Sequence, residues 1–261
     1  MKYYGGCDVG STYTKAVILD ENGKICADTT IRSKINSEVS AKLAMEEVLN
    51  KVGLNSSEEL GYLIGTGYGR NKVPFADENI SEISCHAMGV HVTDPSVKAI
   101  IDIGGQDVKG ISIDTDGTVK NFAMNDKCAA GTGRFLEVMA NVLRMRVDEL
   151  EVCAARAEKP AAISNTCTVF AESEVISQLA NGVSRDDLVA GICDSVARKV
   201  SGLAKRIGIV PQLCMSGGVA QNAGVRLALE AQLGEPILFS DKAQLFGAIG
   251  AAIYAYNKRN K

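Results

Sequence analysis

The strongest constraint on this chain is an internal repeat, in which an aspartate followed by a glycine turn occurs twice at an offset of 94 residues, first at Asp8 and again at Asp102. A lysine, a second aspartate and a turn ending in glycine follow each aspartate at the same distances. They are Lys15, Asp20 and Asn22-Gly23 in the first copy, and Lys109, Asp114 and Asp116-Gly117 in the second. Several matched offsets rarely arise by chance, so they predict a duplication of two α/β halves facing each other.

Each copy is typical of a strand, a glycine turn, a second strand and a tight hairpin, with the second strands at residues 16–19 and 110–113. Apolar residues at helical spacing predict helices at 41–52, 78–92, 133–145, 147–157, 171–181, 185–207, 219–233 and 243–256. Short strands are expected at 213–216 and 237–239. We expect an α/β protein with domains 1–97 and 98–261 packed around a cleft, whose C-terminal helix is free to pack back on the first domain.

Composition narrows the classes of function. The 261 residues carry 28 Lys and Arg against 31 Asp and Glu, a net charge of −3, so no basic surplus exists to bind a nucleic-acid backbone. Apolar runs are far shorter than a membrane span, and the first residues contain no apolar signal core. We expect a soluble cytoplasmic protein that binds neither nucleic acid nor membrane.

The glycine turns favour a phosphate ligand, because they present backbone N–H groups with no side chain in the way. The first loop adds the hydroxyls of Ser11, Thr12 and Thr14 and the charge of Lys15, while Asp8 and Asp102 would hold Mg²⁺ through water. A third turn, 216–219, at a strand-to-helix junction strengthens the case for a nucleotide over two hairpins that merely turn. No Walker A motif occurs, which excludes the ordinary P-loop NTPases.

The eight cysteines fall into two groups. Five have the apolar surroundings of core residues, and Cys85 is expected to be structural despite its neighbour His86; the five are Cys7, Cys26, Cys153, Cys193 and Cys214. Cys128 and Cys167 instead lie in polar segments just before predicted helices, where free N–H groups favour a thiolate or an anionic cluster.

Two cysteines are too few for a metal centre, because zinc or an iron–sulfur cube normally takes four ligands and the chain has no C-x-x-C pair. A two-fold homodimer would supply four by contributing Cys128 and Cys167 from each chain. A reactive thiol at either position is the alternative.

The three glycine turns together resemble the phosphate and adenosine motifs of the superfamily of actin, hexokinase and the heat-shock chaperones. The resemblance implies two duplicated ribonuclease-H-like domains, the actin-like ATPase fold, that clamp Mg·ATP in a nucleotide cleft. It also implies residues that contact the nucleotide: Gly10, Ser11, Thr12, Thr14, Lys15, Gly104, Gly105, Gln106, Gly217, Gly218 and Gln244.

Longer segments resemble a narrower family, the 2-hydroxyacyl-CoA dehydratase activators, or archerases, together with the benzoyl-CoA reductase ATPase subunits. They are residues 66–70 (TGYGR), 84–87 (SCHA), 102–107 (DIGGQD), 125–135 (NDKCAAGTGRF), 166–174 (TCTVFAESE) and 216–222 (SGGVAQN). The similarity runs essentially end to end. One departure is Cys7, where an aliphatic residue is more usual.

This resemblance implies an oxygen-sensitive homodimer bridged by one [4Fe–4S] cluster on Cys128 and Cys167. Ferredoxin or flavodoxin would reduce it, and ATP hydrolysis would drive one electron into a 2-hydroxyacyl-CoA dehydratase or a related iron–sulfur reductase. For hydrolysis we favour Asp102 on Mg²⁺ and Gln106 on the attacking water; the alternative is that both only shape the loop. Two other functions stay open: a small-molecule kinase without a cluster, and a nucleotide-switched interaction module.

Overall fold

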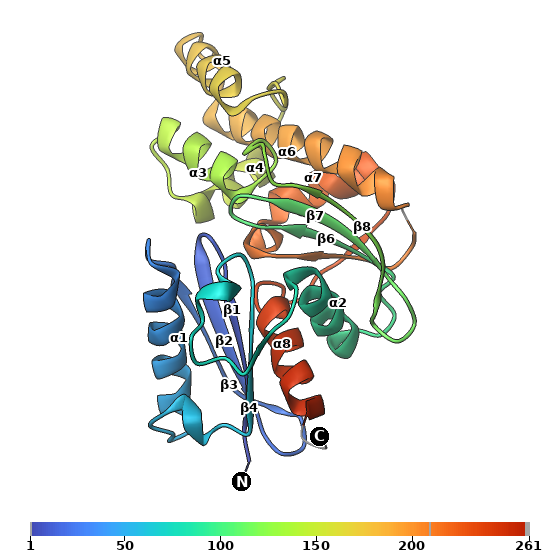
Figure 1. Cartoon of the computed structure of the whole chain (residues 1–261). Coiled ribbons are helices and arrows are strands. Elements are labelled where there is room, and N and C mark those ends of the chain that lie inside the picture. The colour runs from blue at the N-terminus through green and yellow to red at the C-terminus, as the bar shows by residue number, and fades with distance from the viewer. Residues whose placement is uncertain (1, 209, 259–261) are drawn as a thin grey trace. The chain divides into compact units, whose positions relative to one another are not determined.

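The computed structural model describes residues 2–208 and 210–258 and divides into two compact units (Figure 1). Unit 1 comprises Met1–Val97, Ile113–Lys120 and Gln244–Lys261, and unit 2 comprises Lys98–Ser112 and Asn121–Ala243. The domain boundaries at 97 and 98 stay a prediction. Within the described residues, no helix has both the length and the hydropathy that a membrane crossing requires.

Unit 1 is built on a five-stranded mixed sheet in the order β3-β2-β1-β4-β5. Its strands are β1 (Tyr4–Val9), β2 (Tyr13–Leu19), β3 (Ile25–Arg32), β4 (Tyr62–Thr66) and β5 (Glu78–Asn79). Its helices are α1 (Ser37–Lys51), α2 (Glu82–Thr93), α8 (Phe246–Asn257) and the short 3-10 turns η1 (Ser57–Glu59) and η2 (Arg70–Lys72). The central strand β1 runs antiparallel to β2 and parallel to β4.

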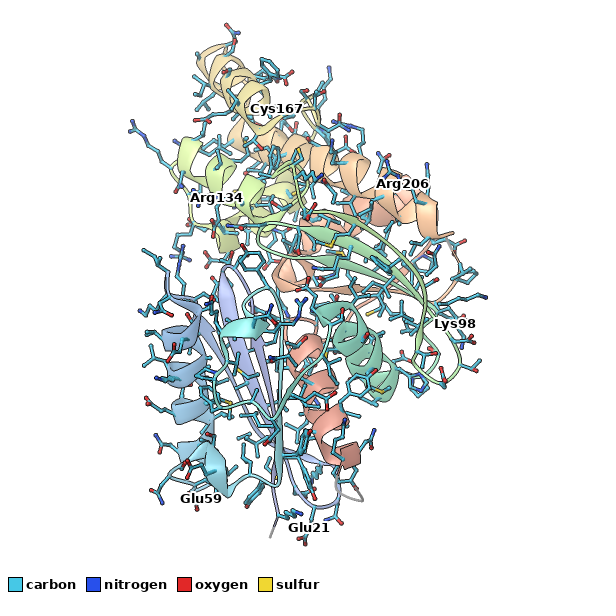
Figure 2. The ribbon with its side chains drawn as sticks, viewed as in Figure 1. Glu21, Glu59, Lys98, Arg134, Cys167 and Arg206 are labelled. Carbon is cyan, nitrogen blue, oxygen red and sulfur yellow. The ribbon has the colours of Figure 1, made fainter. Side chains whose placement is uncertain are left out.

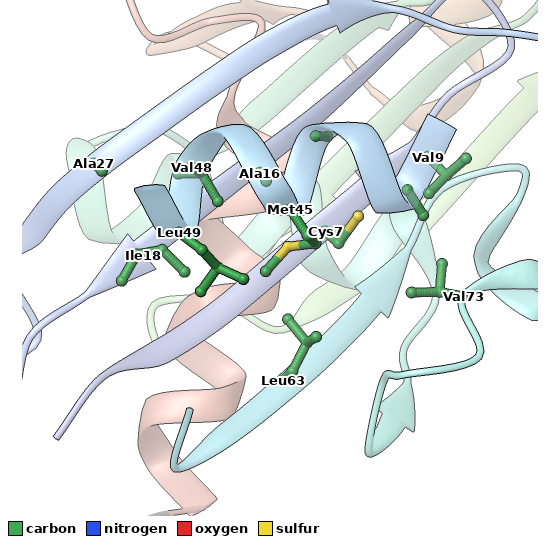
Figure 3. Close-up of a cluster of buried hydrophobic side chains, with 12 residues drawn as sticks. Cys7, Val9, Ala16, Ile18, Ala27, Met45, Val48, Leu49, Leu63 and Val73 are labelled. Atoms are coloured by element: carbon green, nitrogen blue, oxygen red, sulfur yellow. The ribbon is translucent and has the colours of Figure 1, made fainter. Parts of the chain in front are cut away.

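Strand alternation gives this sheet two apolar faces. On one face Cys7 and Val9 of β1 pack with Met45 and Leu49 of α1, in a buried cluster that Figure 3 shows beneath the helix. On the other face Tyr4 and Ile64 pack against Ala251 and Ala255 of α8, and α2 packs against α8 in turn. Because both faces are covered, the inner strand β1 is buried along its whole length.

Unit 2 repeats the mixed five-stranded sheet, in the order β10-β9-β6-β7-β8. Its strands are β6 (Ala99–Ile103), β7 (Val108–Ile113), β8 (Val119–Asn125), β9 (Leu213–Ser216) and β10 (Ile237–Leu238). Its helices are α3 (Gly133–Val142), α4 (Leu150–Arg156), α5 (Thr168–Ala180), α6 (Arg185–Ile207) and α7 (Ala223–Leu233), with 3-10 turns η3 (Val147–Glu149) and η4 (Gly218–Gln221). The long helix α6 contacts α4, α5 and α7.

The duplication predicted from the sequence is confirmed down to single hydrogen bonds. The N–H of Gly10 donates to the carbonyl of Tyr13, and the N–H of Gly104, 94 residues later, donates to that of Asp107. The two hairpin turns are closed by the same pair of bonds, at Asp20, Gly23 and Lys24 and at Asp114, Gly117 and Thr118. Gly23 and Gly117 both have φ near +80°, the conformation for which an Asn-Gly or Asp-Gly turn is selected.

Most elements lie where the sequence predicts them, and α6 and β9 coincide with their predicted ranges. The helix predicted from residue 78 begins only at Glu82, because Glu78–Asn79 instead pairs with β4 as the edge strand β5.

The prediction that Cys26 is a core residue is wrong. Cys26 is exposed on β3, because alternation on this strand turns its neighbour Ala27 to the core instead.

The crossing of α2 and α8 gives a testable prediction of stability. A Cβ added at Gly250 would overlap the carbonyl oxygen of Cys85, and backbone cannot swing aside as a side chain can. We expect Gly250→Ala to destabilise the protein by about 1–3 kcal/mol, the usual cost of overpacking. Gly202→Ala is the control, because Gly202 is also helical but has open space around its Cα. That control should keep or raise the midpoint of thermal unfolding, and equal midpoints for the two variants would contradict the prediction.

Candidate functional site

In unit 1 the first glycine loop begins at a buried ion pair. Asp8, the residue before the end of β1, lies opposite Lys15 of β2, and Lys15 Nζ lies 2.8 Å from Asp8 Oδ2. Both side chains are largely buried, so each charge depends on the other for compensation. The pair fixes a carboxylate and an ammonium at the mouth of the loop, where a magnesium–phosphate ligand would need them.

Two further segments of unit 1, not assigned to the site from the sequence, close around Asp8. A Cβ on Gly67 would overlap Asp8 Oδ1, and Gly67 has φ +88°. A Cβ on Gly247 would lie 2.6 Å from Asp8 Oδ2 and 3.0 Å from His86 Nε2. The motifs TGYGR and SCHA were noted only as marks of the family resemblance. The structure places Gly67 of the first motif against Asp8, and Gly247 between Asp8 and His86 of the second motif.

Unit 2 repeats this arrangement at the second glycine loop. Asp102 Oδ2 lies 3.3 Å from Lys109 Nζ, which also lies 2.7 Å from Asp107 Oδ2. Asp102 Oδ1 accepts a 2.7 Å hydrogen bond from the Ser216 hydroxyl. Both oxygens of Asp102 therefore have protein partners, an arrangement that suits contact with Mg²⁺ through water, since magnesium keeps several of its waters.

The third turn lies directly against the second. Because β9 runs parallel to β6, Ser216 is in register with Asp102, and the two strands end side by side. Gly217 has φ +84°, and a Cβ there would overlap the carbonyl oxygen of Ile103. Its N–H donates to the carbonyl of Ala243, the residue before Gln244. Unit 2 therefore brings Gly104, Gly105, Gly217 and Gly218 together at one end of its sheet.

The polar side chains of the loops differ in availability. Ser11 and Gln106 are exposed and Thr12 is half-buried, so all three can reach a ligand. Thr14 is fully buried, and its hydroxyl pairs with that of Ser33 at 2.9 Å. The Ser33 hydroxyl in turn lies 2.8 Å from the carbonyl of Gly10, so Thr14 supports the loop from below. The nucleotide contacts assigned to these residues stay a prediction.

Apart from the exposed Cys26, the cysteines predicted to be core or structural residues are buried, whereas Cys128 and Cys167 are not. Burial raises the pKa of the thiols of Cys7, Cys85 and Cys193 to about 12, so these remain protonated core residues. Cys128 and Cys167 are only half-buried, and neither sulfur has a hydrogen-bond partner among the described residues. They are the half-exposed thiols of unit 2 that remain open to ligation.

The segment that carries Cys128 is tied to the second glycine loop. Helix α3 begins at Gly133, and the N–H groups of Gly133 and Arg134 donate 2.9 Å hydrogen bonds to the carbonyl oxygens of Gly104 and Gly105. We expected the free N–H groups of this helix to point at a cluster on Cys128. The first two N–H groups of α3 instead bond to the second glycine loop. The start of α3 therefore connects that loop to the segment that carries Cys128.

Cys167 is placed differently, as the N-cap residue of α5 (Figure 2). The segment before it is held from two helices. On α5, Glu174 accepts from the N–H of Ser164 at 2.7 Å. On α6, Ser195 donates to the carbonyl of Ser164 at 2.9 Å, and Arg198 donates to that of Ile163 at 2.6 Å.

Helix α6 supports both cysteine segments, and α3 and α5 pack together. A Cβ on Gly131 would lie 3.0 Å from Lys199 Cγ, so the Cys128 segment also rests on α6. Among the described residues no three His, Cys, Asp or Glu side chains gather to hold a metal ion. Val169 and Phe170, which follow Cys167 on α5, are both exposed.

Comparisons with known proteins agree with this geometry. The sequence profile of the BadF/BadG/BcrA/BcrD ATPase family matches residues 6–255. The chain is 51% identical over 260 residues to the (R)-2-hydroxyglutaryl-CoA dehydratase activating ATPase of Acidaminococcus fermentans, covering 99% of each protein. It is 48% identical over 259 residues to the activator of lactoyl-CoA dehydratase of Anaerotignum propionicum, again covering 99% of each.

Solved structures give the same relationship. Component A of the Acidaminococcus fermentans dehydratase superposes with a TM-score of 0.96 at 50% identity, over 100% of both chains. The Clostridium difficile activator of 2-hydroxyisocaproyl-CoA dehydratase, with bound ADPNP, superposes with a TM-score of 0.95 at 46% identity, over 99% of this chain and 96% of that one. A ROK family glucokinase of Streptomyces griseus, at 13% identity and a TM-score of 0.60, shares the fold alone.

The actin-like ATPase fold predicted from the sequence is therefore confirmed. The duplicated glycine loops and the end-to-end similarity lead to one conclusion: the chain belongs to the BadF/BadG/BcrA/BcrD ATPase family.

Proposed function

We propose that this ATPase is an activator that delivers single low-potential electrons to a 2-hydroxyacyl-CoA dehydratase or a related iron–sulfur reductase. Two relatives that match this chain end to end are named as activators of such dehydratases, which supports the choice of partner. A relative with bound ADPNP supports ATP as the ligand. The electron source would be ferredoxin or flavodoxin.

The nucleotide would lie against the three glycine turns. Gly10, Ser11, Thr12, Thr14 and Lys15 would serve the phosphates from unit 1. Gly104, Gly105 and Gln106 would do so from unit 2, with Gly217, Gly218 and Gln244 beside the adenosine. Asp8 and Asp102 would hold Mg²⁺ through water, since both are buried and paired to lysines that fix their position.

A [4Fe–4S] cluster between two chains would be held by Cys128 and Cys167 of each, and would supply reversible one-electron chemistry. This chain contributes the support of those thiols. Arg198 and Ser195 hold the carbonyls before Cys167 through side-chain hydrogen bonds. Rigid placement of the four sulfurs is what a shared site requires of each protomer.

The observation that carries the proposal is the pair of hydrogen bonds from α3 to the second glycine loop. A change of that loop on ATP binding or hydrolysis must either move Gly133 and Arg134 with it or break their bonds to Gly104 and Gly105. Both outcomes alter the support of Cys128. These two bonds support a coupling between bound ATP and Cys128, which a sugar kinase of the same fold would not need.

Metal content tests the thiol assignment. After strictly anaerobic purification we expect about two iron and two acid-labile sulfide per chain, the count for one four-iron cluster shared by two chains. Cys128→Ser or Cys167→Ser should lose most of it, while Cys26→Ser, at an exposed thiol, should retain it. Absence of iron in the parent protein after reconstitution would contradict the assignment and favour the kinase.

The connection between α3 and the second glycine loop can be tested by removing one hydrogen bond, from Gly133 to Gly104. Gly133 follows the N-cap Thr132, so proline is compatible with this first helical position. It removes the N–H that bonds to Gly104 and also brings the proline ring against that carbonyl oxygen, which lies 2.9 Å from the Gly133 nitrogen. We expect Gly133→Pro to lower the electrons delivered per ATP hydrolysed about tenfold, the equivalent of one lost hydrogen bond.

Arg185→Pro is the matched control, because Arg185 is exposed at the first position of α6 after the N-cap Ser184. It should leave the ratio of electrons to ATP unchanged. An unchanged ratio in Gly133→Pro, measured with normal iron content, would refute the route through α3.

Gln106 is exposed on the second loop, and we propose that it orients the attacking water. Gln106→Ala should lower ATP hydrolysis about 100-fold with little change in ATP affinity, as loss of a group that acts on the water implies. Gln232→Ala, at an exposed glutamine on α7, should leave hydrolysis intact. Full ATPase activity in Gln106→Ala would remove this residue from the mechanism.

A further inference from the structure

Unit 2 contains a cavity of about 290 Å³ that the nucleotide loops do not use. It lies between the sheet and the C-terminal half of α6, where Figure 2 marks Arg206. Its lining residues come from β7, β8, the Cys128 segment and α6: Val108, Met124, Asn125, Ala130, Lys199, Val200, Gly202, Leu203 and Arg206.

The cavity is cationic without internal compensation. Lys199 and Arg206 line it, and none of the lining residues is acidic. Neither cation forms an ion pair within the described part of the chain, whereas the neighbouring Arg198 pairs with Asp194 on the same helix. In a chain of net charge −3, two uncompensated cations at one opening mark a local site for an anionic ligand.

The spacing of the two cations favours an extended partner over a single small anion. Lys199 and Arg206 are seven residues apart on α6, so their Cα atoms are separated by about 10 Å along the helix axis. One phosphate or carboxylate cannot easily satisfy both. Two carboxylates on an acidic protein surface would match this separation.

Apolar surface adjoins the cations. Val108, Val200 and Leu203 are buried in the floor of the cavity, and Met124 of β8 is 37% exposed at its edge. Phe122, two residues earlier on this edge strand and therefore on the same face as Met124, is 52% exposed. Lys199 and Arg206 thus lie beside a small apolar patch that includes Met124 and Phe122. Such a surface suits a transient protein contact, in which opposite charges speed association and apolar side chains pack at the interface.

The cavity is built on the segment that carries Cys128. Asn125 and Ala130, on either side of Cys128, both line it. Gly131 lies against the stem of Lys199, which holds that side chain beside the segment. A protein seated here would contact the residues that flank a proposed cluster ligand, while Asp126 and Lys127 are exposed next to it and offset each other in charge.

We infer that this cavity, with Phe122, is the docking site of an acidic electron-carrier protein that reduces the activator. The inference rests on the proposed function. One electron passes from the reduced carrier to the dimer, so the carrier is oxidised and the dimer is reduced by one electron, with no bond made and no proton moved. Small electron-transfer contacts of this kind are weak and depend on salt.

The test uses the double variant Lys199→Glu/Arg206→Glu and oxidised ferredoxin from the same organism as the probe. At low ionic strength we expect its dissociation constant for the activator, measured by calorimetry, to rise about tenfold or more. We expect the rate constant for reduction by reduced ferredoxin to fall about 10- to 100-fold. High salt should weaken binding to the parent protein and largely remove the difference.

The matched control is Arg185→Glu/Lys205→Glu, which changes the same charges on the same helix at exposed positions outside the cavity. It should bind ferredoxin nearly as the parent does. Lys199→Gln replaces the double variant if that variant fails to fold, because glutamine keeps the Cβ and Cγ that pack on Gly131. It should show a smaller loss of affinity for ferredoxin.

Iron content, ATPase activity and reduction by dithionite are measured on every variant. Normal values for all three with weakened ferredoxin binding support the site. Unchanged ferredoxin binding in the double variant overturns it, as does dissociation of the dimer or a selective loss of binding to the dehydratase. A parent protein without iron would instead refute the proposed function, so the two failures are distinguishable.

Discussion

Two backbone hydrogen bonds, from Gly133 and Arg134 to the carbonyls of Gly104 and Gly105, are the constraint on which the rest of unit 2 depends. They attach the second glycine loop to the start of α3 and so to the segment that carries Cys128. Backbone groups cannot change partners by rotating a side chain, so a movement of the loop is transmitted to the helix or costs two bonds. The two bonds join the second glycine loop to the segment that carries Cys128.

The duplicated ion pairs hold the loops themselves in place. Asp8 with Lys15 and Asp102 with Lys109 occupy equivalent positions at the ends of β1 and β6. A buried carboxylate without its lysine would be strongly destabilising, so neither residue of a pair is free to change alone. Under the proposed function, Asp8, Lys15 and Asp102 would also serve magnesium and phosphate, so stability and binding would depend on the same residues.

The two glycine loops and their ion pairs could be predicted from the sequence, because the residues that form them lie close together in the chain and occur twice. Lys15 and Lys109 follow their aspartates at a spacing that a tight two-strand turn brings into register, and the offset of 94 residues marks the second copy. The contact of α3 with the loop could not be predicted, since it joins backbone groups that carry no side-chain signature. Gly67 and Gly247 reach Asp8 only through the fold. Cys26 was misplaced because an edge strand exposes alternate residues, and composition alone does not say which.

The central claim is that ATP controls the passage of an electron out of this protein. The most direct test loads an activator dimer with one electron, removes the reductant and mixes it with its dehydratase under ATP, under ADP or without nucleotide. The account predicts that the dehydratase is reduced rapidly with ATP and hardly at all in the other two samples. Reduction at the same rate in all three would contradict it.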